Sequence, residues 1–169
     1  MDGGKRVWND LSSEEKSAVT KTEPNEARFW TGSSTDDYGD GIGGEYNAKY
    51  RAIDDDGKTL EMKLFDDNNI DRDSIDWREA SECYAKGASG DVKCYKGDNV
   101  REDSVYNTAE KPVINDNENI NSITEVDNVV NTVRIRKTGT SRIPGQAQAC
   151  HGYSTFPTQQ PDAVTRKEI

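Results

Sequence analysis

The spacing of hydrophobic and polar positions predicts three short helices along the chain. Residues 11–19 contain serines that can cap a helix and acidic residues in the first turn. Residues 44–53 place two tyrosines and an isoleucine on one stripe. Residues 77–87 place Trp77 and Ser81 one helical turn apart, with alanines and a tyrosine beside them, so these side chains share one face.

Hydrophobic runs outside these helices predict four short strands. Residues 27–31 form an aromatic run stopped by a glycine, and residues 92–95 are a β-prone run between turn residues. Residues 120–126 and 129–137 follow, the second with the alternation of a half-buried strand. Residues 59–65 fit either a strand or the opening turn of a helix. Helices that separate strands predict an α/β domain with a small central sheet and flanking helices.

Length and composition favour one domain with a modest core. The chain has 169 residues, of which 31% are hydrophobic, and this suits a single domain with a strongly solvated surface. We place that domain at residues 1–137. Residues 138–169 are rich in glycine, proline, serine, threonine and glutamine, a composition that predicts an extended or partly disordered arm.

The charge balance argues against two classes of partner. Asp and Glu outnumber Lys and Arg by 32 to 22, which gives a net charge of −10. Nucleic-acid-binding proteins normally carry a basic patch, and no cluster of five or more basic residues is visible in the sequence, so nucleic acid is not an expected partner. The same charge disfavours an anionic membrane surface, and no window is apolar enough for a membrane-spanning helix.

The cysteines and the single histidine limit the chemistry further. Three cysteines do not make a disulfide framework, although one bridge between Cys83 and Cys94 is possible if their elements pack face to face. Cys150 and His151 are adjacent in the polar arm, and His151 is the sole histidine of the chain. We therefore expect no metal site, and no mechanism built on a Ser-His or Cys-His pair.

The stretch 77–110 carries the most informative side chains. It reads as a helix, a turn, a strand and a second turn that ends at Glu110, and we expect Pro112 to end any local helix after it. Taken singly, Trp77 fits a hydrophobic core and Glu110 fits a solvated surface charge. Taken together, an indole and a hydroxyl on one helix and a carboxylate after the strand suit a ligand that is flat, cationic and linked to a sugar.

Four motifs in a fixed order strengthen this interpretation. Trp30 lies in FWT, Glu61 in TLE, Trp77 and Ser81 in WREAS, and Glu110 at the end of SVYNTAE. In this order the chain resembles the ADP-ribosyl cyclase family, the animal NAD glycohydrolases. It also looks like toxin domains at the C-termini of bacterial polymorphic and Rhs-type proteins. The animal proteins carry many disulfide-forming cysteines, which this chain lacks.

The resemblance implies an ADP-ribosyl cyclase-like fold and cleavage of the nicotinamide–ribose bond of NAD, which gives nicotinamide and either ADP-ribose or cyclic ADP-ribose. In that reaction Glu110 would stabilise or trap the oxocarbenium-like centre. Trp30 and Trp77 would stack the nicotinamide and ribose, and Glu61 would accept a hydrogen bond from the carboxamide and bias attack by water or adenine. NAD would be a substrate, so the resemblance implies neither a cofactor nor a metal.

Further residues take roles in the same reaction. Ser81 and the backbone amides around Ser104 would hold ribose hydroxyls and phosphate. Val105 and Tyr106 stand where the family has a small residue and an aromatic residue that help to settle cyclisation against hydrolysis, so the product stays open. The net charge of −10 does not attract an anionic dinucleotide, and local backbone amides and Arg28 or Arg101 would have to offset it.

Two other functions remain open at this stage. ADP-ribosyl transfer to a macromolecule would use the same glutamate and NAD, whereas a non-enzymatic acidic binding module would use only the charge. The first ten residues lack the apolar core of a signal peptide. An excised toxin domain, a chain without its leader and a cytosolic protein would all begin in this way. If the chain is a toxin, we expect it to be secreted or delivered into target cells and to have an immunity or inhibitor protein as partner.

Overall fold

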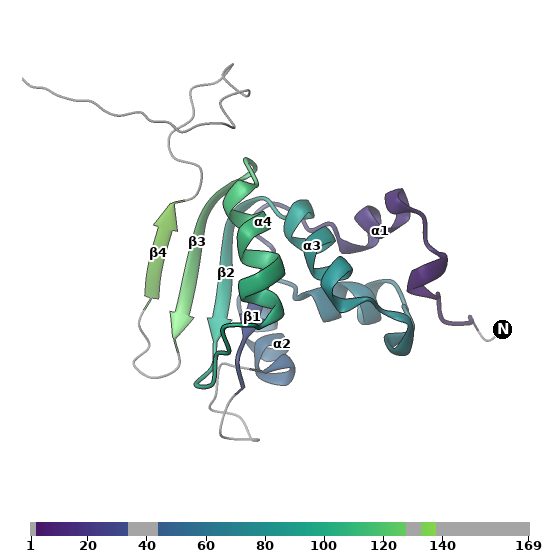
Figure 1. The fold of residues 1–169 in the computed structure, drawn as a ribbon, viewed down its shortest axis with the longest axis horizontal. Helices are drawn as coiled ribbons and strands as arrows, with labels where there is room; N and C mark the ends of the chain where they lie inside the picture. Colours follow the sequence, from purple (N-terminus) through teal and green to yellow (C-terminus); the bar gives the residue numbers. More distant parts are fainter. Residues whose placement is uncertain (1–2, 34–43, 128–132, 138–169) are drawn as a thin grey trace, which may run out of the picture. The chain divides into compact units, whose positions relative to one another are not determined.

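The computed structural model describes residues 3–33, 44–127 and 133–137, which contain a four-stranded sheet (Figure 1). The strands lie in the order β1-β2-β3-β4; the first three are parallel, and the fourth is antiparallel to the third. Their bounds are β1 Arg28–Thr31, β2 Gly90–Lys96, β3 Ile120–Asp127 and β4 Val133–Lys137. The predicted α/β class is confirmed, whereas the predicted arm at 138–169 lies outside the described residues.

Helices form at all three predicted positions, and additional turns lie between them. The α-helices are α1 Ser13–Thr20, α2 Glu45–Asp54, α3 Trp77–Gly87 and α4 Lys111–Asp116. Two 3-10 turns, η1 Trp8–Asp10 and η3 Arg72–Ser74, and two π-helical segments, η2 Met62–Asp67 and η4 Tyr106–Glu110, complete the helical structure of the described residues. Ser12 and Glu15 cap α1 reciprocally, because each side chain accepts the backbone N–H of the other residue.

The structure settles one open alternative and corrects one expectation. Residues 59–65 are helical rather than extended, since the helix that starts at Leu60 runs directly into η2. Pro112 does not end the local helix as expected. It lies in the first turn of α4, immediately after η4. The helix continues from η4 into α4, because Glu110 and Lys111 both have helical dihedral angles. Proline removes one N–H donor there, and the carbonyl of Thr108, four residues earlier, accepts the Arg78 guanidinium at 3.1 Å.

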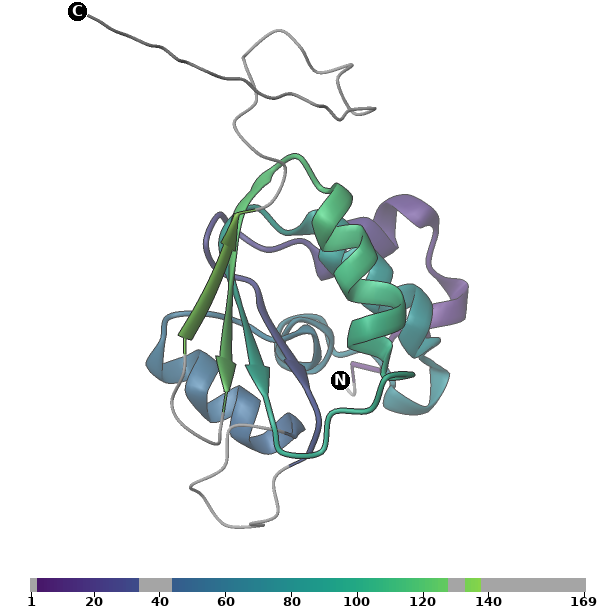
Figure 2. The ribbon, with the colours of Figure 1, turned by 60° about the vertical axis from the view of Figure 1, so that its left-hand side comes forward.

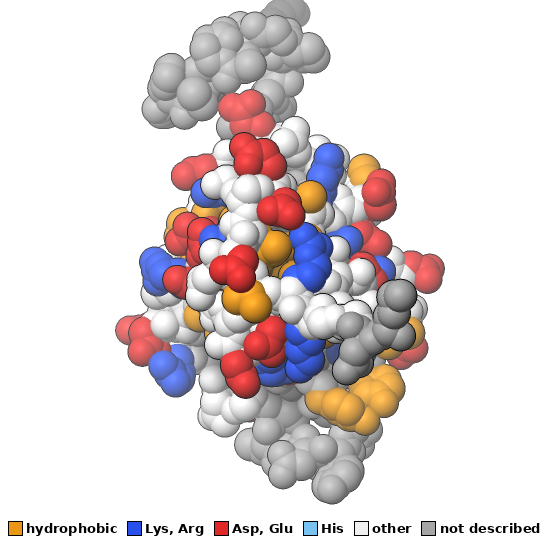
Figure 3. Space-filling view, turned by 90° about the vertical axis from the view of Figure 1, so that its right-hand side faces the viewer, with side chains coloured by type: hydrophobic (Ala, Val, Ile, Leu, Met, Phe, Trp, Pro, Cys, Tyr) orange, Lys and Arg blue, Asp and Glu red, His pale blue; other side chains and the backbone are white. Residues whose placement is uncertain are grey.

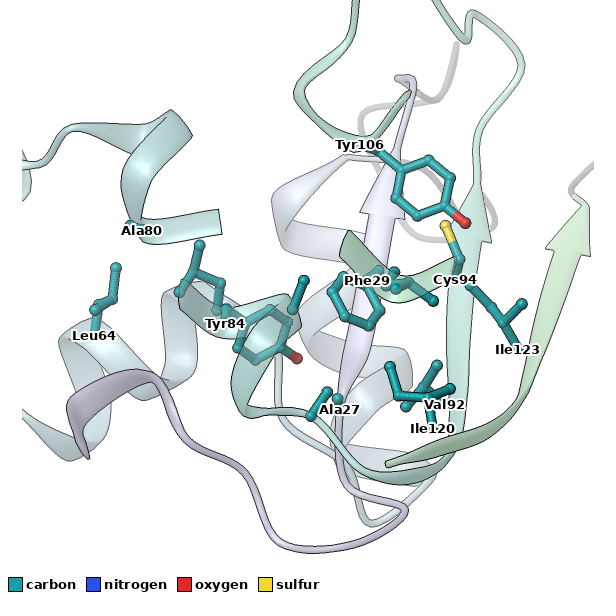
Figure 4. Close-up of a cluster of buried hydrophobic side chains, with 14 of the residues drawn as sticks. Ala27, Phe29, Leu64, Ala80, Tyr84, Val92, Cys94, Tyr106, Ile120 and Ile123 are labelled. Carbon is teal, nitrogen blue, oxygen red and sulfur yellow. The ribbon is translucent and has the colours of Figure 1, made fainter. Parts of the chain in front are cut away.

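The two faces of the sheet pack against different helices (Figure 2). On the face covered by α3 and α4, Phe29 of β1 and Cys94 of β2 join the main core (Figure 4). On the other face, Trp30 packs against a smaller cluster that contains Ala48 of α2. Consecutive strand residues point to opposite faces, which separates Phe29 from Trp30. β1 is an edge strand, so the segments beside it can reach both its faces and its free edge.

No disulfide links β2 to α3. Cys83 and Cys94 are both free thiols, so the bridge left open by the sequence does not form. Cys94 is fully buried and lies beside the hydroxyl of Tyr106 (Figure 4), and burial raises the pKa of its thiol well above the usual range.

The hydroxyl of Tyr84 joins α3 to β1 in the main core. Tyr84 is fully buried, and its ring packs edge-on against Phe29 with 4.9 Å between the ring centroids (Figure 4). Its oxygen accepts the backbone N–H of Arg28 at 2.8 Å and donates to the carbonyl of Lys58 at 2.5 Å. One side chain therefore satisfies backbone groups on two segments that border the candidate site.

The stripe of hydrophobic residues predicted on α2 forms but faces outward. Tyr46, Tyr50 and Ile53 are each more than half exposed, whereas the inner face of α2 consists of the small residues Ala48 and Ala52. Alanines let the helix approach the sheet closely, so the helix packs through its smallest side chains.

Removal of the Tyr84 hydroxyl tests its structural role. We expect Tyr84→Phe to lower the free energy of unfolding by about 0.5–1.5 kcal/mol, because the part-buried Lys58 carbonyl loses its O–H donor but still accepts the backbone N–H of Arg28 at 3.0 Å. Tyr50→Phe is the control, since it removes an exposed hydroxyl that hydrogen-bonds Tyr46 at 2.9 Å on the outer face of α2, and should cost less than about 0.5 kcal/mol. Urea denaturation measures both values, and equal losses would contradict this account.

Candidate functional site

A cavity of about 350 Å³ opens beside β1. Its walls come from β1, from the start of η2, from α3 and from the segment that leads into η4. The volume lies within the range of small-molecule sites. All eight site residues predicted from the sequence line it: Arg28, Trp30, Glu61, Trp77, Ser81, Ser104, Tyr106 and Glu110.

Two carboxylates in the lining sit at the ends of π-helical segments. Glu61 immediately precedes η2, and Glu110 is the last residue of η4. Both are almost fully buried, with exposed fractions of 8% and 7%. A π-helical turn adds a residue to the helical ladder and redirects the side chains around it, and such turns occur often at functional sites. The local backbone thus directs two acids towards a space that excludes most water.

Burial dominates the electrostatics of this pair. Desolvation, with a further contribution from the Glu61 carboxylate, raises the pKa of Glu110 to about 8, although a hydrogen bond from Ser81 opposes the shift. Burial also raises the pKa of Glu61, partly offset by hydrogen bonds to the ionised form. Among these, Trp30 Nε1–H lies 3.1 and 3.2 Å from the two oxygens of Glu61. Both carboxyl groups therefore hold their protons more tightly than exposed glutamates do.

The two tryptophans are held in different ways. The indole N–H of Trp30 is committed to Glu61, so a ligand can meet Trp30 only through its ring. Trp77 is the first residue of α3, where the side chain of Asp76 caps the helix. The ring of Trp77 packs edge-on against Phe65 at a centroid distance of 6.0 Å. Both indoles are therefore oriented by contacts within the protein.

Ser104 and Tyr106 hold the η4 segment in place beside β1. Ser104 Oγ accepts the hydroxyl of Thr31 at 3.2 Å and the backbone N–H of Asn107 at 3.3 Å. Tyr106 is 2% exposed, and its hydroxyl donates to Glu125 at 3.3 Å. The hydroxyls of both residues are used within the fold, so the sequence-based role of Tyr106 can involve only its ring.

A buried ionic cluster lies behind Glu110. Glu125 of β3 is 2% exposed and pairs with Lys96 of β2 at 3.4 Å and with Lys111 at 3.2 Å. Lys111 directly follows Glu110, and Tyr106 begins the same π-helical segment. Glu125 therefore attaches both ends of the segment that carries Glu110 to the sheet.

Arg28 has a structural role that the sequence did not suggest. Its guanidinium donates to the carbonyl oxygens of Asn25 at 2.7 Å and Asp55 at 2.8 Å, and its Nε lies 3.3 Å from the Asp55 carboxylate. With only 6% of the residue exposed, this cation holds the end of α2 against β1. Arg101, the other basic residue proposed to offset ligand charge, pairs with Asp103 on the surface and is not part of the lining.

Arg72 and Glu45 line the cavity and were missed from the sequence. Arg72 lies in an acidic stretch that reads as a linker, and Glu45 looks like an ordinary first-turn acid of α2. The Arg72 guanidinium forks onto both carboxylate oxygens of Glu45 and lies over the rings of Phe65 and Trp77, at 5.0 and 5.6 Å from their centroids. Only the tertiary fold brings these residues together, so no local signal marks them.

The chain has no match among protein-family models, curated proteins or solved structures. Within the described part of the chain, no group of three or more His, Cys, Asp or Glu side chains is placed to hold a metal ion. The described helices are all too short or too polar to cross a membrane. Figure 3 shows acidic and basic side chains intermixed over one face of the molecule.

The burial of Glu110 predicts a pH-dependent stability. The pKa of Glu110 in the folded protein is about 8, whereas an exposed glutamate has a pKa of 4.5, so the folded state binds this proton more tightly than the unfolded state does. The resulting stabilisation is complete below about pH 4.5 and is lost as pH rises through about 8. We therefore expect Glu110→Gln, which cannot ionise, to gain stability relative to the wild type between pH 5 and pH 8.

Thermal unfolding of both proteins across this pH range measures the effect. Glu82→Gln is the matched control, because Glu82 lies on α3 and makes only a partly exposed pair with Arg78. A difference in Tm between wild type and Glu110→Gln that does not change with pH would show that Glu110 titrates normally.

Proposed function

We propose that the protein is an NAD glycohydrolase or ADP-ribosyl cyclase, which cleaves the bond between nicotinamide and ribose and leaves ADP-ribose or its cyclic form. The proposal includes an ADP-ribosyl cyclase-like arrangement of the α/β fold. One observation carries it: Trp30, Glu61, Trp77 and Glu110 come from four separate segments of the sequence and line one cavity. Those are the residues on which the resemblance to the family rests.

The proposed reaction requires one negatively charged group close to the ribosyl carbon. The nicotinamide of NAD is a pyridinium, which leaves as a neutral base and needs no proton from a general acid. Ordinary glycoside hydrolysis differs because a second carboxyl group must protonate the departing oxygen. In the proposed reaction the Glu110 carboxylate faces the ribosyl carbon as positive charge develops there, and either stabilises that charge or bonds to it.

The raised pKa of Glu110 is compatible with this role. Without a bound cation the carboxyl holds its proton near neutral pH, because burial disfavours the charged form. A bound pyridinium supplies a positive charge that favours ionisation and lowers the pKa. Low solvent access then strengthens the attraction between the carboxylate and the developing oxocarbenium centre. Substrate binding thus produces the ionised form that the reaction uses.

The other lining residues fit the ligand in complementary ways. In the proposed complex the ring of Trp77 stacks on the pyridinium, a contact of about 0.5–2 kcal/mol that weakens once the departing base is neutral. Glu61, held by Trp30, accepts a hydrogen bond from the carboxamide. Ser81 is 4% exposed and bonded to Glu110, and it orients that carboxyl group towards the ribose.

The likeness to bacterial toxin domains extends the proposal to secretion or delivery into target cells. An enzyme that consumes NAD endangers the cell that makes it, so a producing cell would need an immunity or inhibitor protein. Val105 lines the cavity and is 41% exposed, which offers such a partner a hydrophobic contact at the rim. An inhibitor seated there would block access to Glu110.

Release of nicotinamide from NAD, followed by chromatography, tests the proposed activity. We expect turnover by the wild type and a loss of about 10²–10³-fold or more in kcat for Glu110→Gln, which keeps the shape of the side chain and removes its charge. Glu79→Gln is the control, since Glu79 bonds Trp8 and Lys16 away from the cavity. Absence of nicotinamide release by folded wild-type protein would reject the proposal, and labelled ADP-ribose retained on a macromolecule would indicate transfer instead.

The pH dependence of turnover gives a separate test of the role of Glu110. If the ionised form is required, kcat/KM rises with pH and levels off above about 8, the pKa in the empty cavity. We expect kcat to level off at a lower pH, because the bound pyridinium favours the carboxylate. Steady-state rates between pH 5 and pH 9 measure both profiles. A kcat/KM that falls as pH rises would instead assign Glu110 as a proton donor.

A further inference from the structure

An anionic dinucleotide needs a cation in or beside the cavity. The chain carries a net charge of −10, and the described lining includes three glutamates, at positions 45, 61 and 110. The same lining carries two basic side chains, Arg28 and Arg72. Arg28 is buried and its guanidinium is committed to Asn25 and Asp55. Arg72 is therefore the described lining cation that a ligand can reach without disrupting the core.

Arg72 is already arranged as an anion-binding group. Its side chain is 52% exposed, and its guanidinium lies over the rings of Phe65 and Trp77. Aromatic faces orient the plane of a guanidinium, which leaves its N–H groups free to form a fork. In this structure the fork holds the Glu45 carboxylate through both oxygens. Two parallel N–H groups of a guanidinium can donate to two oxygens of a carboxylate or to two oxygens of a phosphate.

The Glu45 carboxylate can leave this position at little cost. It is 37% exposed, and it lies in the first turn of α2, where the helix N-terminus and solvent stabilise its charge without Arg72. An ion pair with this exposure contributes little to folding. A diphosphate brings two negative charges in place of one, so exchange at Arg72 favours the ligand.

We propose that Arg72 binds the diphosphate of the dinucleotide, and that Glu45 occupies this place when the cavity is empty. The inference rests on the proposed function for the identity of the ligand, and it adds the residue that recognises the anionic part. Arg72 contacts Trp77 directly, so the anionic part of the ligand is held next to the indole proposed to stack the pyridinium. The phosphate-bearing ligand is thereby favoured over a phosphate-free one.

In a competing interpretation, Arg72 weakens the binding of the ligand instead of strengthening it. A guanidinium over Trp77 is a planar cation, as a pyridinium is, so Arg72 could block the stacking face and weaken the binding of NAD. The exposed fork and its exchangeable carboxylate favour the first interpretation, because a blocking residue needs no paired donors directed at an anion. The two interpretations predict opposite effects when the charge of Arg72 is removed.

Calorimetric titration with ADP-ribose, which carries the diphosphate but no pyridinium, tests the proposal without turnover. We expect Arg72→Gln to weaken the affinity about tenfold or more, since a charge-assisted fork is lost. Glu45→Gln should tighten the affinity about two- to fivefold, because the resident anion no longer competes. Arg6→Gln is the control, as it removes a partly exposed arginine that pairs with Glu15 outside the lining, and should change the affinity less than about twofold.

Nicotinamide release from two substrates separates this inference from the proposed function. Arg72→Gln should raise KM for NAD about tenfold and leave KM for nicotinamide riboside, which has no phosphate, within about twofold. If ADP-ribose binds with the expected variant pattern but nicotinamide is never released, the proposed function fails and the anion site stands. Tighter or unchanged binding of ADP-ribose by Arg72→Gln, or no binding by the wild type, would overturn the inference.

Discussion

Two almost fully buried glutamates line one cavity, and the rest of the structure makes this arrangement possible. The charged forms of Glu61 and Glu110 are both disfavoured by burial, and the Glu61 carboxylate adds to the cost of charging Glu110. Two apolar residues at these positions would avoid the cost of burying ionisable groups, so the pair lowers the stability of the fold. Ionisable groups with such shifted pKa values occur most often at functional sites. A positively charged ligand lowers the free-energy cost of ionising Glu61 and Glu110. The part of the cavity beside these two carboxyl groups is therefore suited to a cation, whereas Arg72 supplies the positive charge for an anionic group.

Holding such a pair requires rigid support from the fold. Glu61 is fixed by the indole N–H of Trp30, which leaves only the tryptophan ring for a ligand. Glu110 ends a π-helical segment whose two ends bond to Glu125, a buried residue of the central sheet. The edge strand β1 supplies one wall without closing the space. The carboxylates thus lie between elements that restrict their movement, as precise placement of a reacting group requires.

Short-range patterns located the three longest helices and the four strands, because caps and periodicity are local properties, whereas most of the eight predicted lining residues came from the resemblance to a known family. Serine capping located α1, and the i, i+4 spacing of Trp77 and Ser81 located the inner face of α3. The same reasoning could not find the π-helical turns, since they depend on packing around Glu61 and Glu110. The prediction that Pro112 ends the local helix was wrong. The sequence also assigned Arg28 to a ligand, because no local pattern indicates that Asp55 is its partner. Arg72 and Glu45 were missed for the same reason, because their pairing exists only in three dimensions.

The central claim is that the cavity receives a pyridinium linked to ribose, with the ribosyl carbon beside Glu110. The most direct measurement is a crystal structure of the Glu110→Gln protein with NAD bound, since this variant should hold the substrate without cleaving it. The account predicts the ribosyl carbon of the nicotinamide half within about 3–3.5 Å of the side chain at position 110, the distance of a reactive contact. An NAD molecule bound elsewhere, or one whose nicotinamide points away from Trp77 and position 110, would contradict it.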